Sequence, residues 1–150
     1  MGVRVELAAG SVEIQRMADY LLVVERGVLA GPECAVAYRR AMERERDAHG
    51  VRHCVIDQRG DGDGGAEGRA LLWQWLDPDA FDRVALVASG DMRATELNME
   101  ALARRMPVRA FTTLVEAKEW ALRPHQARRT SVPPAPPSVE TAPYAALELD

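Results

Sequence analysis

The fold is decided by residues 83–122, which read RVALVASGDMRATELNMEALARRMPVRAFTTLVEAKEWAL. Residues 84–88 are apolar at every position and follow a charged residue, which is typical of a strand covered on both faces. A second strand is expected over residues 108–111, and an amphipathic helix over residues 92–106 joins the two. Because parallel strands need a crossover of a dozen or more residues, this order predicts a β-α-β unit and an α/β domain.

The sequence also predicts where the last helix of this stretch begins. Thr113 and Glu116 have the spacing of a capping box, in which two side chains bond to backbone N–H groups at the helix start. On the helix before it, Met92, Met99, Leu102 and Met106 form an apolar stripe. We expect this stripe to be core, because flexible thioethers fill irregular gaps between packed elements.

The chain before residue 83 predicts further strands and helices. Alternating apolar residues over positions 3–7 and 12–14 indicate a hairpin, and the continuous apolar run at 20–24 indicates a more deeply covered strand. Gly31 can cap a helix whose first residue is Pro32 and which ends near residue 48, before Gly50.

A strand over residues 51–57 is followed by residues 58–65, a run that is too rich in glycine for regular structure. A short helix over residues 67–76 follows, with an apolar stripe that includes Leu71 and Trp75. The whole is predicted to be a single α/β domain with a mixed sheet of about five or six strands and crossover helices.

The composition changes after residue 122. Six of the nine prolines lie between Pro124 and Pro143, and large apolar residues are few. Such a segment cannot bury enough surface to offset its ordering entropy, so we expect a domain at 1–122 and a disordered, proline-rich tail at 123–150. Within the tail, the Thr130 and Ser131 hydroxyls follow two arginines and resemble a kinase target.

Composition limits the classes of partner. A net charge of −4 gives no long-range attraction to phosphate backbones, so nucleic acid is not expected as a partner. No run approaches the length of a membrane span, and the first residues lack the apolar core of a signal peptide. Cys34 and Cys54 are expected to be buried free thiols, which favours a reducing, cytoplasmic location.

No cluster of residues predicts catalysis. His53 and Cys54 alternate along one strand, so their side chains point to opposite faces and cannot form a nucleophilic pair. No acid falls in a predicted apolar pocket that would raise its pKa. The segment from Asp61 to Glu67 has too few oxygen ligands for calcium. We therefore expect no enzyme activity, no metal and no cofactor.

The order of elements and three phrases carry a family resemblance. The phrases are ERGVLAGPE at 25–33, RVALVAS at 83–89 and RAFTTLVEAKEWA at 109–121. The chain resembles the STAS superfamily over about residues 3–122, and within it the small bacterial proteins similar to sporulation anti-sigma-factor antagonists (SpoIIAA-like). The resemblance implies a cytoplasmic signalling or scaffolding module that binds a protein partner. The sequence identifies neither the partner nor the oligomeric state, and a homodimer stays open.

The resemblance also implies a place for a regulatory switch. In the antagonists a phosphorylated serine follows the strand that corresponds to residues 51–57, but residues 57–68 contain no Ser or Thr here. Asp61 or Asp63 could supply a permanent negative charge at that place, although a carboxylate carries less charge than a phosphate.

Two binding sites are predicted at the carboxyl ends of the strands, where open α/β sheets place their sites. The first is a protein-binding surface of Arg59, Asp61 and Asp63 with Trp73, which lies at the margin of the apolar arc of its helix and would be an interface anchor. The alternative is a nucleotide or lipid site between this loop and the end of the next strand. Its residues would be Asp57, Ser89, Gly90 and Asp91.

Overall fold

The computed structural model describes residues 2–29, 31–60 and 65–124. Among these residues the chain forms six strands and four helices in the order β1 (Gly2–Glu6), β2 (Ala9–Arg16), β3 (Leu21–Val28), α1 (Pro32–His49), β4 (His53–Gly60), α2 (Gly65–Trp75), β5 (Arg83–Val87), α3 (Asp91–Arg104), β6 (Val108–Phe111) and α4 (Leu114–Ala121). The predictions made for Asp61, Asp63, Thr130, Ser131 and the tail beyond residue 124 lie outside the described residues.

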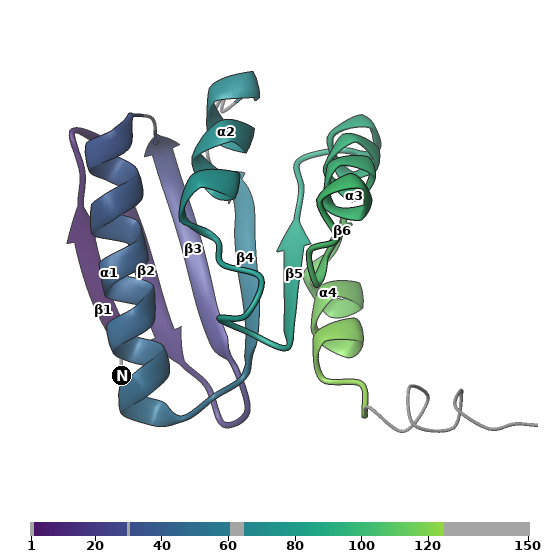
Figure 1. Cartoon of the computed structure of the whole chain (residues 1–150), viewed down its shortest axis with the longest axis horizontal. Helices are drawn as coiled ribbons and strands as arrows, with labels where there is room; N and C mark the ends of the chain where they lie inside the picture. Colours follow the sequence, from purple (N-terminus) through teal and green to yellow (C-terminus); the bar gives the residue numbers. More distant parts are fainter. Residues whose placement is uncertain (1, 30, 61–64, 125–150) are drawn as a thin grey trace, which may run out of the picture.

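The strands form one mixed sheet whose spatial order equals the order along the chain, β1-β2-β3-β4-β5-β6. Strand β2 is antiparallel to its neighbours β1 and β3, and β3, β4, β5 and β6 are parallel. In Figure 1 the parallel strands point upward, so their carboxyl ends lie together at the top of the sheet. The predicted α/β class, the mixed sheet and the β-α-β crossover are confirmed.

Two apolar layers cover the sheet. The larger layer packs α1, α2 and α3 against one face, and the smaller layer packs α4 against the other face of β4 and β5. Successive residues of β5 alternate between them, since Val84 and Leu86 face the larger layer while Ala85 and Val87 face the smaller. Because both faces of this strand are covered, the side chains of residues 84–88 are all buried, and these residues are therefore all apolar.

The predicted ends of α1 are confirmed, and the predicted capping box of α4 is confirmed in part. Gly31 and Pro32 stand at the start of α1, and Gly50 ends it in the left-handed conformation with φ 66°. At α4 the Thr113 hydroxyl accepts a hydrogen bond from the Glu116 backbone N–H at 3.2 Å. The Glu116 carboxylate accepts a bond from that hydroxyl, instead of from the Thr113 backbone as the capping box would have it.

The glycine-rich connection after the fourth strand is shorter than predicted. Strand β4 continues through Gln58 and Arg59 to Gly60, and α2 begins at Gly65. The strand continues because Gly60 is still paired with Arg26 on β3, past an irregularity in the register. At Gly60 a Cβ would lie 3.2 Å from the Glu25 carbonyl oxygen, so the close approach of the two strands favours glycine there.

The prediction that the methionine stripe is core was wrong for its first three members. Met92, Met99 and Leu102 are exposed, and only Met106 packs partly against the core. Helix α3 instead buries Ala94, Leu97 and Ala101. The helix is apolar on two sides, and sequence periodicity alone does not tell which side meets the sheet.

The last strand is an edge strand that α3 protects. The Asn98 side chain donates to the Ala110 carbonyl oxygen at 3.1 Å and accepts from the Ala110 N–H at 2.7 Å. An amide side chain therefore takes the place of a seventh strand at this residue and blocks pairing of β6 with another chain.

Within the described residues, no helix combines the length and the apolar character that crossing a bilayer requires.

Candidate interaction site at the carboxyl ends of the strands

The sheet brings most of the predicted site residues to one edge. Asp57 on β4 is paired in register with Val87, the last residue of β5, so the segment from Ser89 to Asp91 starts beside the end of β4. We call Asp57, Arg59, Ser89, Gly90 and Asp91 the carboxyl-end surface. Asp61 and Asp63, which the sequence predicted as part of this site, lie outside the described residues.

The side chains of Asp57 and Arg59 form a bidentate ion pair on one face of β4. The Asp57 carboxylate accepts from the Arg59 backbone N–H at 3.0 Å, from its Nε at 3.0 Å and from its Nη2 at 2.8 Å. These bonds from Arg59 lower the pKa of Asp57, against the opposing effect of its partial burial. The same pair raises the pKa of Arg59. Both groups are therefore charged at neutral pH, and the exposed guanidinium is held in one place.

The end of β5 adds small polar residues. Ser89 and Asp91 are exposed, and Gly90 is the N-cap residue of α3, with extended backbone and without a side-chain cap bond. Asp91 carries a negative charge in the first turn, where the helix dipole favours it. These residues extend the charged edge made by Asp57 and Arg59.

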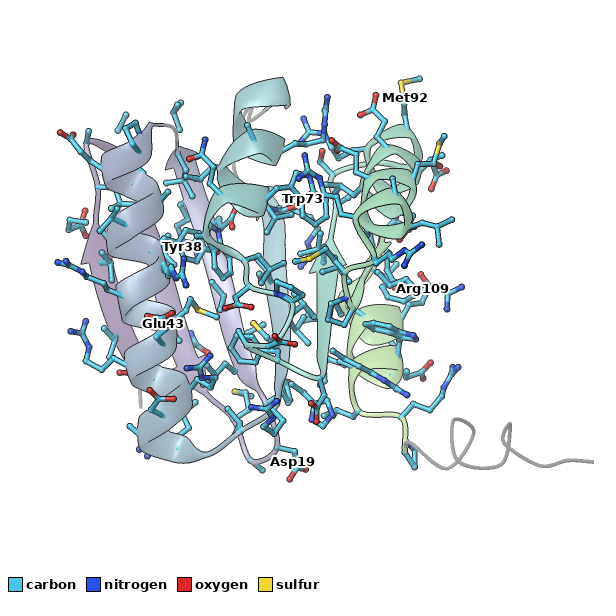
Figure 2. The ribbon with its side chains drawn as sticks, in the orientation of Figure 1. Asp19, Tyr38, Glu43, Trp73, Met92 and Arg109 are labelled. Carbon is cyan, nitrogen blue, oxygen red and sulfur yellow. The ribbon has the colours of Figure 1, made fainter. Side chains whose placement is uncertain are left out.

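Trp73 is less exposed than the sequence led us to expect. It packs partly against the larger apolar layer, and the Arg104 guanidinium carbon lies 5.3 Å from the centre of its ring. Its indole N–H is buried and meets no acceptor among the described residues. Figure 2 shows Trp73 between α2 and α3. The other tryptophan of this helix, Trp75, is 3% exposed and stacks on Tyr38 with ring centres 4.4 Å apart.

Ion pairs tie α2 to α3 beside Trp73. Arg69 on α2 lies 3.2 Å from Glu96 and 3.1 Å from Glu100 on α3. With the Arg104–Trp73 contact, these pairs fix how α2 and α3 lie against each other. Sequence analysis did not predict them, because they depend on how separate helices pack.

A buried polar cluster lies under the same edge and was missed. Glu25 on β3 is 4% exposed, and its carboxylate accepts from the Tyr38 hydroxyl at 2.5 Å and from the Gln58 amide at 3.3 Å. The sequence placed no acid in an apolar pocket that would raise its pKa, whereas the structure shows that Glu25 is an almost fully buried acid with hydrogen-bond donors around it. The available signal was a glutamate that directly follows the apolar run Leu21 to Val24 on the same strand.

The cluster predicts a dependence of stability on alkaline pH. Burial, followed by the nearby Glu25 charge, raises the pKa of Tyr38, so above about pH 10 the folded state keeps a proton that the unfolded chain has lost. The unfolded state then binds fewer protons, and the free energy of unfolding should fall as the pH rises. Burial raises the pKa of Cys54 as well, so the fall should begin near about pH 8.5.

Urea unfolding from about pH 8 to about pH 11 would measure this dependence. In the variant Tyr38→Phe, the fall in the free energy of unfolding above about pH 10 should be absent. In Cys54→Ala, the fall that begins near about pH 8.5 should be absent. Identical profiles for the variants and the parent would contradict this assignment.

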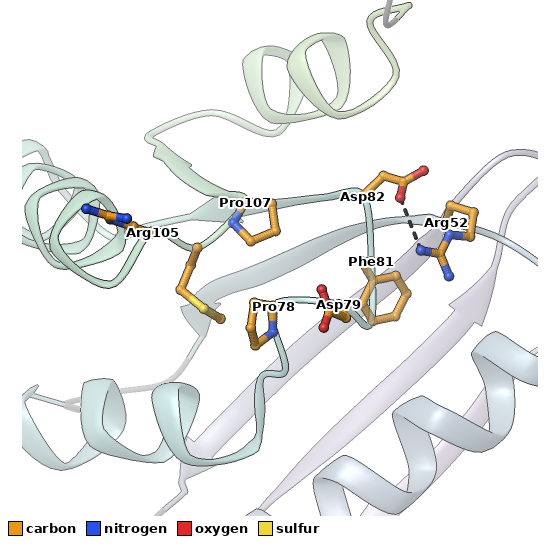
Figure 3. Close-up of a pocket in the computed structure, with 8 residues that line it drawn as sticks. Arg52, Pro78, Asp79, Phe81, Asp82, Arg105 and Pro107 are labelled. Carbon is orange, nitrogen blue, oxygen red and sulfur yellow. Dashed lines mark hydrogen bonds and ion pairs between the residues drawn. The ribbon is translucent and has the colours of Figure 1, made fainter.

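A cavity of about 690 Å³ lies at the opposite, amino-terminal edge of the parallel strands. It is lined by Arg52, Phe81, Asp82 and Arg105 among others, and the Arg52 guanidinium bonds the Asp82 carboxylate at 3.1 Å (Figure 3). Residues of the carboxyl-end surface do not line this cavity. This cavity is therefore not the ligand site predicted at Asp57, Ser89, Gly90 and Asp91.

The comparisons with known proteins identify the fold. Neither a scan of protein-family models nor a search of curated proteins gives a match. Among solved structures, an uncharacterized DUF3478-family protein with a SpoIIAA-like fold from Shewanella loihica PV-4 is similar at 17% identity and TM-score 0.51, over 80% of this chain and 99% of that one. An anti-sigma factor antagonist from Mycobacterium paratuberculosis is similar at 17% identity and TM-score 0.51, over 75% and 94%.

The chain therefore has a SpoIIAA-like fold. Both solved structures are covered almost completely, so the similarity extends over a whole domain of this type. The resemblance inferred from the element order and the three phrases is confirmed at the level of the fold.

Proposed function

We propose that this chain is a non-catalytic protein-interaction module of a bacterial regulatory or scaffolding pathway and binds its partner through the carboxyl-end surface. The proposal rests mainly on one observation, the placement of Arg59. Arg59 is an exposed arginine that Asp57 holds in a fixed position at the open edge of the sheet. A side chain that is already ordered loses little entropy on binding, and arginine is enriched among residues that dominate binding energy.

The remaining donors of Arg59 indicate the chemistry of the contact. A guanidinium has five N–H groups, and Asp57 engages one on Nε and one on Nη2. The other N–H groups can bond carboxylate or carbonyl oxygens of a partner. Trp73 lies apart from this pair, because Asp57 and Arg59 share the face of β4 on which Val55 packs in the smaller layer, whereas Trp73 packs on the larger layer. Asp61 and Asp63, which follow Gly60 in the sequence, would add negative charge to the contact.

The proposed module has no serine or threonine over residues 57–68, where the antagonists of this fold carry their switch. Its contact is therefore constitutive at this site and not set by phosphorylation there. The anti-sigma factor antagonist among the similar structures supports the class of function, since such a protein acts on another protein.

Affinity capture from the cells that encode this chain, followed by calorimetry with the captured protein, would test the proposal. Arg59→Glu should weaken binding by about 10-fold or more, because it loses the donors and places two acids side by side. Arg52→Glu is the matched control, since Arg52 is also an exposed arginine paired with an aspartate but lies at the opposite edge. An equal loss in both variants, or none in Arg59→Glu, would contradict the proposed surface.

A further inference from the structure

Helix α3 carries apolar side chains that nothing in the described part of the chain covers. The exposed fractions are 79% for Met92, 67% for Met99 and 80% for Leu102. Counted as a heptad, Met92 and Met99 occupy a positions, while Thr95 and Leu102 occupy d positions. We call these four residues the α3 seam. A narrow a/d stripe of this kind is suited to contact with another helix. Figure 2 shows Met92 on the outer side of α3.

We propose that the α3 seam pairs with the α3 seam of a second copy of this chain, with the two helices antiparallel about a twofold axis. The seam is complementary to itself in this direction. Met92 would lie beside Leu102 of the other copy, and Met99 beside Thr95, with each contact made twice. A seam over two heptads matches the length of α3, which has 14 residues and is about 21 Å long.

The charges at the ends of α3 favour the antiparallel direction. Asp91 stands at the first turn and Arg105 at the C-cap. No ion pair within residues 2–29, 31–60 and 65–124 includes either of them. In an antiparallel pair Asp91 of each copy lies near Arg105 of the other, and the two helix dipoles oppose each other. A parallel pair would instead bring Asp91 beside Asp91.

One pair of like charges opposes this arrangement. Glu96 flanks the seam near the proposed axis, so the Glu96 carboxylates of the two copies would approach each other. Each is already paired with Arg69 of its own chain at 3.2 Å, which offsets part of the repulsion. The seam has four residues, against about 20–30 residues per side in a standard interface, so the dimer should be weak and should depend on concentration.

Sedimentation velocity of the full chain from micromolar to near-millimolar concentration tests the proposal. The parent should shift from monomer to dimer over this range. Met99→Glu should weaken the dimer by about 10-fold or more, because it would bury a carboxylate in the apolar seam. The control Val115→Glu makes a similar change at an exposed position on α4 and should leave the dimer unchanged.

A charge exchange tests the antiparallel direction. Asp91→Arg alone should weaken the dimer, and Asp91→Arg combined with Arg105→Asp should restore it. A parent that stays monomeric at every concentration would overturn the proposal. So would a dimer that survives Met99→Glu, which would place the interface on another surface such as the β1 edge or another helix face. Failure of the double exchange to restore association would overturn the antiparallel direction.

Discussion

The variant Tyr38→Phe should lower the free energy of unfolding by about 2–3 kcal/mol, since it removes the hydroxyl that donates to the buried Glu25 carboxylate. Tyr38 is fully buried and Glu25 is 4% exposed, so water cannot easily replace the lost donor. The Gln58 amide would remain at 3.3 Å, a longer and weaker bond. Urea unfolding at neutral pH would measure the change.

The control for this prediction is Tyr20→Phe. Tyr20 is also buried, and its hydroxyl makes no hydrogen bond to another described residue, so its removal should cost less than about 0.5 kcal/mol. A double-mutant cycle of Tyr38→Phe with Glu25→Gln should give a coupling of about 1 kcal/mol or more. Additive changes would show that the two side chains do not stabilise each other.

The variant Asn98→Ala should cost about 2 kcal/mol and should expose the edge of the sheet. It leaves the Ala110 N–H and carbonyl without the partners at 2.7 and 3.1 Å that the Asn98 amide provides. A strand edge with open backbone groups is a template for pairing with another chain. Chemical denaturation would measure the first effect, and gel filtration on storage would measure the second.

Glu119→Ala is the control, because Glu119 is exposed on the neighbouring helix α4 and lies outside the α3 seam. Its effect on stability should stay within about 0.5 kcal/mol. If Asn98→Ala is as stable as this control and remains free of aggregates, the amide does not protect the edge.

The sequence predicted the parts of the fold that depend on local patterns. The continuous apolar run at residues 84–88 is a central strand because both faces are covered, and Gly31, Gly50 and Thr113 mark helix ends through local backbone chemistry. The register then places Asp57 beside the end of β5, as the rule for parallel strands indicates.

Features that depend on packing between distant elements could not be predicted. Whether Met99 or Leu97 faces the sheet depends on how α3 lies on β6, and both sides of the helix are apolar. Arg104 over Trp73 requires the relative placement of α2 and α3. Glu25 is buried because Tyr38 and Gln58, from a helix and a neighbouring strand, supply its donors.

The most direct test of the proposed function is hydrogen–deuterium exchange of the full chain with and without the captured partner. Binding at the carboxyl-end surface should slow exchange over residues 57–60 and 88–92, where β4 and β5 end. Exchange over residues 78–82 and 105–107, which line the cavity at the opposite edge, should not change. Protection confined to that opposite edge would contradict the account.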